Sequence, residues 1–162
     1  MQRFPAFVQR LPITTAALEY AERLHAGQTR DADGADFIEH PLEVAALLHE
    51  SGAPDDVVAV GVLHDTLEKT EAAASELRPR FGDRITNLVL AVTEDDTIDD
   101  FDARKAALLT QVAKAGAEAQ MVFAVIGLAV ALAGALIGLL VCIARLRRSA
   151  SASPRSSTWT PR

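Results

Sequence analysis

The sequence of 162 residues has a single cysteine, Cys142, so no disulfide can form within the chain. Basic residues are also scarce in residues 1–120, which contain most of the charged residues. Residues 1–120 contain all 22 acidic residues but only 11 of the 16 basic ones, which gives this head a formal net charge of −11. Because nucleic-acid binding needs clustered lysine and arginine to neutralise phosphates, the acidic head argues against a nucleic-acid partner.

Two further absences limit the possibilities for the head. Residues 1–15 include Arg3 and Arg10 but no apolar segment of the length that a secretory signal requires, so we expect no such signal. The acidic stretch at 93–102 lacks the central glycine and the terminal glutamate of an EF-hand loop. We therefore expect a solvent-exposed loop there and not a calcium site.

Charge is missing altogether from residues 121–144, which are rich in valine, leucine, isoleucine, alanine and glycine. A helix of this length can cross a bilayer, and a soluble helix of the same length would be expected to show a polar face. We predict a transmembrane helix here, with a buried core helix as the alternative. Small residues four apart, Gly134 and Gly138, hint at helix packing and a homodimer.

These observations divide the chain into three parts. The composition of residues 1–120 is sufficient for one domain with a sizeable core, followed by the predicted transmembrane helix at 121–144. Residues 145–162 form a basic tail rich in serine, arginine and proline, which cannot bury a core and is expected to be disordered. We expect the head to face the cytoplasm, because it shows no export signal.

The head is predicted to be all-α. Apolar residues at helical spacing, with hydroxyl, proline or acidic residues at the starts and glycine at the ends, predict its helices. The first is expected from Thr14 or Thr15 to Ala26 and the second from Pro41 to about Ser51. The third begins at 54–56 and carries an apolar run that includes His64. A fourth is broken near Pro79, and a fifth covers residues 101–114.

An adjacent pair, His64 and Asp65, stands out within the apolar helical run around residues 60–67. Imidazole and carboxylate are both good ligands for a divalent metal, and the apolar neighbours would hold them in place. A structural role, in which both side chains serve only hydrogen bonds near a helix end, is the alternative. Upstream, His40 stands just before Pro41, which favours the first turn of a helix and is expected to keep His40 at the helix entrance.

Together the segments Gly-Gln-Thr-Arg at 27–30, His-Pro-Leu-Glu-Val-Ala at 40–45 and Leu-His-Asp-Thr-Leu-Glu at 63–68 resemble the HD-domain hydrolases of the RelA/SpoT type. The small stand-alone alarmone hydrolases belong to this group. The resemblance runs from about residue 15 to about residue 123. It implies an all-helical HD-domain bundle that binds one divalent ion, usually manganese, and removes the 3′-pyrophosphate from guanosine tetra- or pentaphosphate.

Carried over by position, the resemblance makes His40, His64 and Asp65 metal ligands. It implies that Glu68 helps to activate the attacking water and that Arg30 contacts the nucleotide. The chain departs from the family's pattern at two positions.

The first departure is Lys69, which stands where the family usually has an aspartate after the glutamate. The second is Val125, which by register takes the place of the aspartate that is the family's fourth ligand. Because valine cannot ligate a metal, three protein ligands remain.

Two functions are therefore expected as alternatives. The first is a metal-dependent phosphohydrolase that acts on a guanosine-type phosphorylated nucleotide. The second is a catalytically degenerate HD domain, tethered to the membrane, that binds a nucleotide or a partner without turnover. The triad His40, His64 and Asp65 favours the first function, whereas Lys69 and Val125 favour the second. A helical interaction domain that binds no metal is a third possibility.

Overall fold

The computed structural model describes residues 5–151, with side chains for residues 5–135. Within these residues all regular secondary structure is helical, apart from one isolated bridge between Thr29 and Asp36, and the predicted all-α fold is confirmed. The elements, in order, are η1 (Val8–Arg10), α1 (Pro12–Leu24), α2 (Glu39–Glu50), α3 (Asp55–Leu63), α4 (Thr66–Lys69), α5 (Ala74–Val92), α6 (Phe101–Ala115) and α7 (Ala117–Ser151).

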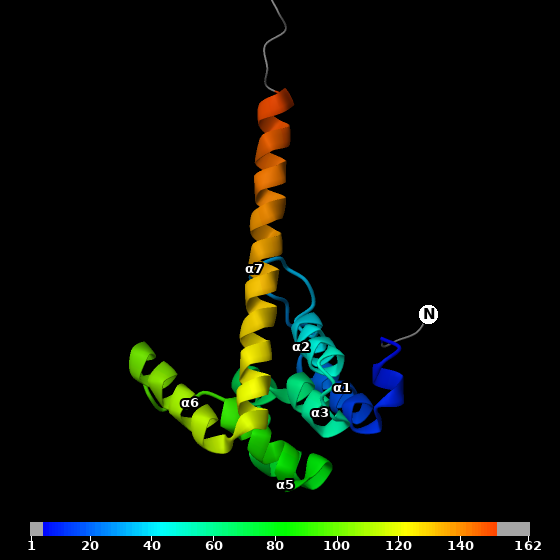
Figure 1. Cartoon of the computed structure of the whole chain (residues 1–162), viewed down its shortest axis with the longest axis vertical. Coiled ribbons are helices and arrows are strands. Elements are labelled where there is room, and N and C mark those ends of the chain that lie inside the picture. Colours follow the sequence, from blue (N-terminus) through cyan, green and yellow to red (C-terminus); the bar gives the residue numbers. More distant parts are fainter. Residues whose placement is uncertain (1–4, 152–162) are drawn as a thin grey trace, which may run out of the picture. The chain divides into compact units, whose positions relative to one another are not determined.

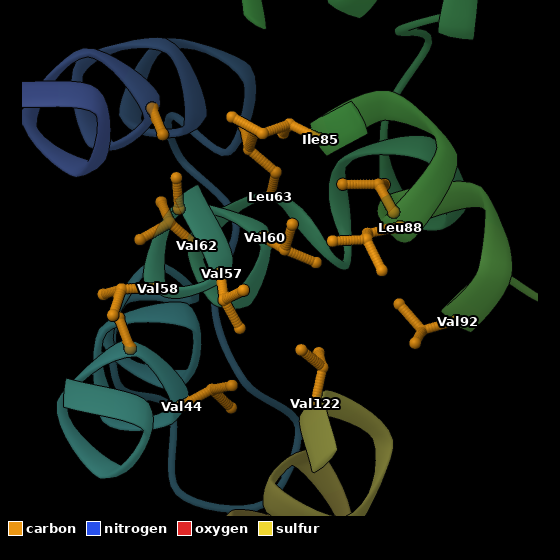
Figure 2. Close-up of a cluster of buried hydrophobic side chains, with 14 of the residues drawn as sticks. Val44, Val57, Val58, Val60, Val62, Leu63, Ile85, Leu88, Val92 and Val122 are labelled. Carbon is orange, nitrogen blue, oxygen red and sulfur yellow. The ribbon is translucent and has the colours of Figure 1, made fainter. Parts of the chain in front are cut away.

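The centre of the fold is α3, which packs against α1, α2 and α5 (Figure 1). Every residue of α3 from Val57 to Leu63 is buried, because helices surround it on more than one face. Figure 2 shows Val60 of α3 among side chains of other helices, including Val44 of α2, Leu88 of α5 and Val122 of α7. Burying a valine or leucine side chain contributes roughly 1.5–3 kcal/mol, so this cluster is the main source of stability.

The chain divides into two compact units, Met1–Ala129 and Val130–Arg162. The first unit therefore extends past residue 120, where the sequence predicted the head to end. Ala119, Val122 and Ala129 of α7 are buried in its hydrophobic core. The helix α7 continues to Ser151, beyond the end predicted at residue 144. The rest of the predicted tail, residues 152–162, lies outside the described residues.

Several helix boundaries differ from the prediction, including those of α1, which begins at Pro12 and ends at Leu24. The helix α2 begins at Glu39, so His40 lies inside its first turn and not before it. Pro41 is tolerated as the third helical residue because the first N–H groups of a helix have no intrahelical acceptor. The break predicted near Pro79 lies instead at Gly82, whose φ of 81° interrupts α5. Glycine adopts this left-handed conformation without the steric cost that other residues incur.

The close approach of α2 and α3 depends on Gly61. A Cβ atom at this position would lie 2.5 Å from Leu48 Cδ1 and 3.2 Å from Val44 Cγ1. We expect Gly61→Ala to lower the free energy of unfolding by about 1–3 kcal/mol, because it overpacks a closed core. Urea unfolding followed by circular dichroism measures the change.

Gly127→Ala is the matched control for this substitution. Gly127 is also in a helix, but a Cβ atom there would meet nothing within 4 Å. Its replacement should be neutral or stabilising by up to about 1 kcal/mol, because alanine favours the helix. Equal effects at the two positions would contradict the packing argument.

Candidate metal centre

The pair His64 and Asp65 lies in the turn between α3 and α4. The sequence predicted that the helix would continue through these residues, but α3 ends at Leu63. Two side chains donate hydrogen bonds to carbonyl groups in the last turn of α3. His64 Nδ1 donates to the carbonyl oxygen of Gly61 at 2.8 Å, and Thr66 Oγ1 donates to that of Leu63 at 2.6 Å. Such local hydrogen bonds compete with the helical ones, although His64 and Asp65 keep right-handed helical backbone angles between α3 and α4.

The three predicted ligands come together at this turn. Ligand atoms of His40, His64 and Asp65 all lie within 4.8 Å of one another. Asp65 Oδ2 is 3.2 Å from His64 Nε2 and 3.8 Å from His40 Nε2. The two imidazole rings meet edge to face, with centroids 5.1 Å apart. Their side chains are largely withdrawn from solvent, with exposed fractions of 14% for His40 and 5% for His64.

The hydrogen bonding of His64 fits a metal ligand. Because Nδ1 donates its proton to a carbonyl group, Nε2 of the neutral ring carries a lone pair. Burial alone would lower the pKa of His64, but the adjacent carboxylate of Asp65 holds it above its usual value, so without a metal the ring favours a second proton on Nε2. This buried Nε2 makes no hydrogen bond of acceptable geometry, although Asp65 Oδ2 is only 3.2 Å away. A lone pair facing a carboxylate oxygen in a buried site is unfavourable unless a proton or a cation lies between them. The donor set of two imidazoles and a carboxylate suits a divalent transition metal.

Burial and neighbouring charge set the protonation of the other two candidate ligands. Burial, assisted by the proximity of His64, lowers the pKa of His40 below its usual value. Burial alone would raise the pKa of Asp65, but the adjacent His64 and the nearby His40 hold it below the usual range. A neutral imidazole and an ionised carboxylate are the forms that bind a metal.

Glu68 lies one helical turn after Asp65, on α4. Its Oε1 accepts a hydrogen bond of 2.6 Å from the backbone N–H of Glu94. Partial burial of the carboxyl group raises the pKa of Glu68, and the charge of Asp65 adds to this effect. A carboxyl group with a raised pKa, held in a fixed orientation, is suited to accept and return a proton.

A cavity of about 340 Å³ opens beside the pair. Its polar lining consists of His64, Asp65, Glu68, Glu94 and Lys105. The remainder is apolar and is formed by Val92, Leu108, Leu109, Phe123 and Ile126.

The residues that α7 contributes to the cavity, Phe123 and Ile126, offer no ligand atom. Val125 is partly buried against the hydrophobic core. Among the described side chains, the cluster therefore has three candidate ligands.

Arg30 is held by carboxylates and does not line this cavity. Its guanidinium pairs with Asp33 at 2.7 Å, with Glu39 at 3.3 Å and with Glu43 at 3.2 Å. Two of these partners belong to α2, the helix that carries His40. The charge of Arg30 is close enough to contribute to the lowered pKa of His40. A nucleotide phosphate that bound Arg30 would compete with these carboxylates.

Three other residues line cavities together with Glu68. They are Lys69, Glu94 and Lys105, and the sequence pattern gave no role to the last two. Lys69 lines a second cavity, of about 480 Å³, whose lining also includes Glu68 and Glu94. Glu94 and Lys105 line the cavity beside the metal cluster, yet the sequence analysis assigned Glu94 to an exposed loop and gave Lys105 no role. Neither residue belongs to a recognisable motif, so no local signal marks them.

Comparison with known families and relatives agrees with this geometry. The sequence profile described as "HD domain" matches residues 17–152. The guanosine-3′,5′-bis(diphosphate) 3′-pyrophosphohydrolase MESH1 of Homo sapiens is 38% identical over 92 residues, which cover 55% of this chain and 51% of that protein. The protein of the same enzymatic name from Aquifex aeolicus is 41% identical over 78 residues, 48% of this chain and 11% of its own length. This chain thus spans about half or less of these curated relatives.

Two solved structures resemble this fold. The crystal structure of lmo0812 from Listeria monocytogenes is 36% identical, with a TM-score of 0.52 over 55% of this chain and 56% of that one. A structure described as a metazoan ortholog of SpoT that hydrolyses ppGpp matches 98% of this chain and 78% of its own, with a TM-score of 0.63. At 24% identity the second match supports the fold alone.

Proposed function

The chain belongs to the HD-domain family and is homologous to ppGpp hydrolases, and we propose that it is itself a metal-dependent phosphohydrolase. The observation that carries this proposal is the buried cluster of His40, His64 and Asp65, in which His64 Nε2 has no hydrogen bond. The proposed substrate is a guanosine nucleotide with a 3′-pyrophosphate, because the curated relatives named above are pyrophosphohydrolases of that compound. Manganese is the proposed ion.

A divalent ion bound by His40, His64 and Asp65 would polarise the phosphate and lower the pKa of a bound water. Glu68 accepts the proton of the attacking water. The oxygen of the water then attacks the phosphorus atom, and the bond between phosphorus and the 3′ oxygen breaks. The 3′ oxygen takes up the proton that Glu68 returns, and pyrophosphate leaves. The backbone N–H of Glu94 orients the Glu68 carboxylate for this transfer.

Removal and return of the metal tests the proposal. We expect the full chain, purified in detergent and treated with a chelator, to release no pyrophosphate from guanosine tetraphosphate. Adding Mn²⁺ should restore release, and metal analysis should show about one ion per chain, in line with the single cluster found among the described residues. Release that continues at full rate in the presence of chelator would refute the metal-dependent reaction.

A second candidate is a degenerate domain that binds the nucleotide without turnover. It is favoured by the two departures from the family's pattern, Lys69 and Val125, and by a cluster that has three candidate ligands among the described side chains. The same measurement separates the candidates. Bound metal with no pyrophosphate release would support the degenerate domain.

Attachment to a membrane, with the head in the cytoplasm, stays a prediction, as does a homodimer. The stretch Ala117–Ala135 of α7 is long and apolar enough for a span, but a buried helix of a soluble protein passes the same criterion. Since the core already buries Val122 and Ala129, the uncharged residues beyond it are 130–144, about 22 Å of helix. A hydrocarbon layer is about 30 Å thick. Failure of the full chain to float with lipid vesicles would argue against attachment.

A further inference from the structure

The cavity beside the metal cluster carries more negative charge than a phosphorylated substrate would favour. Asp65, Glu68 and Glu94 contribute three carboxylates to its lining, and Lys105 is the one cation among the lining residues. A pyrophosphate group is itself highly anionic. A divalent ion at the metal cluster would offset part of the repulsion by these carboxylates, and a further cation close to the phosphate oxygens would offset more of it.

Lys105 lies on α6, and Glu94 fixes its position. The Lys105 ammonium pairs with Glu94 Oε1 and lies 5.3 Å from the centre of the Phe101 ring. An ammonium group has three donors, and the side chain of Lys105 is still 45% exposed. It can therefore keep its ion pair with Glu94 and donate to a second anion in the cavity.

The neighbouring residue, Arg104, also pairs with Glu94, but its side chain lines a different cavity. Its Nε pairs with Glu94 Oε2 at 2.9 Å, and its Nη1 donates to the carbonyl oxygen of Ile98 at 2.8 Å. Its side chain is less exposed, at 25%, and it lines the second cavity instead of the one beside the metal cluster. Arg104 and Lys105 thus share a carboxylate partner, but only Lys105 faces the cluster's cavity.

We propose that Lys105 contacts the phosphate groups of the substrate in the cavity beside the metal cluster. This inference rests on the proposed phosphohydrolase function and adds a substrate contact to it. Glu94 fixes the positions of two residues that line the cavity, Glu68 and Lys105. Its backbone N–H holds the carboxylate of Glu68, and its side chain holds the ammonium of Lys105. The rest of the cavity's lining is apolar and offers no competing partner to the ammonium of Lys105.

Inorganic pyrophosphate is the probe that tests this contact. Its binding to the full chain in the presence of Mn²⁺ would be measured by calorimetry for the unsubstituted protein, Lys105→Gln, Lys105→Arg and Arg104→Gln. We expect Lys105→Gln to weaken binding about 10-fold or more, since a charge-assisted hydrogen bond is lost. Lys105→Arg should retain most of the affinity. Arg104→Gln, which removes an ion pair with the same carboxylate, should change it less than about 3-fold.

The kinetics of nucleotide hydrolysis give an independent readout. Lys105→Gln should raise KM about 10-fold with little change in kcat, and it should leave the metal content unchanged. Equal losses for Lys105→Gln and Arg104→Gln would overturn the inference, because the effect would then act through Glu94. Failure of the unsubstituted protein to bind pyrophosphate would overturn it as well. Binding that depends on Lys105 in a chain that hydrolyses no nucleotide would support the contact and refute the proposed function.

Discussion

Replacement of His64 by alanine is expected to abolish stoichiometric metal binding and to reduce pyrophosphate release below about 1% of the unsubstituted rate. The substitution leaves two of three protein ligands, and loss of even an outer contact of a metal site costs about 10–100-fold in affinity. It also leaves the buried Asp65 carboxylate without its nearest imidazole, which lies 3.2 Å away. Metal analysis after dialysis and a continuous assay for pyrophosphate measure the two losses.

The fold must be monitored in the same experiment, because His64 is buried and donates a hydrogen bond to the carbonyl group of Gly61. Removing that bond should cost about 1–3 kcal/mol of stability. His64→Gln, which is closer in size, serves as a second variant. His49→Ala is the control, since His49 stacks on Phe7 with ring centroids 4.9 Å apart and takes no part in the cluster. If a folded His64→Gln variant kept a full complement of metal, the assignment of His64 as a ligand would be wrong.

The residues of the candidate cluster could be proposed from sequence because each belongs to a short motif. His64 and Asp65 are adjacent, and His40 precedes a proline at the start of a helix. The helical fold could be predicted for a similar reason, since apolar spacing within one segment reports which face of a helix is buried. The structure places the three side chains within 4.8 Å of one another, which no spacing along the chain could establish.

The turn that separates α3 from α4 could not be predicted from apolar spacing. The apolar residues Val60, Leu63 and Leu67 keep a helical spacing, and this pattern is typical of one uninterrupted helix. At the end of α3, His64 and Thr66 donate hydrogen bonds to carbonyl groups of its last turn, which compete with the helical ones. Whether a side chain makes such a bond depends on its rotamer and its surroundings, and residue type alone does not fix either.

Glu94 and Lys105 could not be found because their roles arise from tertiary packing. Glu94 reaches Glu68 across 26 positions of the sequence. The C-terminal end of α5 is in turn held by α6, where Gln111 donates to the carbonyl groups of Leu90 and Thr93. An acidic residue after a helix and a lysine within the next helix are ordinary surface features in a sequence. Only the packing of α5 against α6 makes them part of one cavity.

Replacement of Glu68 by glutamine should lower kcat about 10²–10⁴-fold while leaving KM and the metal content nearly unchanged. Glutamine has the same shape, and its side-chain oxygen can still accept the hydrogen bond that Glu94 donates to Oε1. What it cannot do is accept a proton. Because Glu68 lines the cavity beside His64 and Asp65 without belonging to the cluster of ligands, a selective loss of kcat would identify it as the group that moves the proton.

Two control variants make this measurement specific. Glu71→Gln removes an exposed carboxylate from the same stretch of chain and should leave kcat unchanged, which excludes a general effect of net charge. Glu68→Asp retains a carboxylate but withdraws it from Glu94, so an intermediate kcat is expected. If Glu68→Gln instead kept kcat within about 3-fold of the unsubstituted protein, proton transfer would have to be assigned to another group. Glu94, the other carboxylate outside the metal cluster that lines this cavity, would then be the first residue to test.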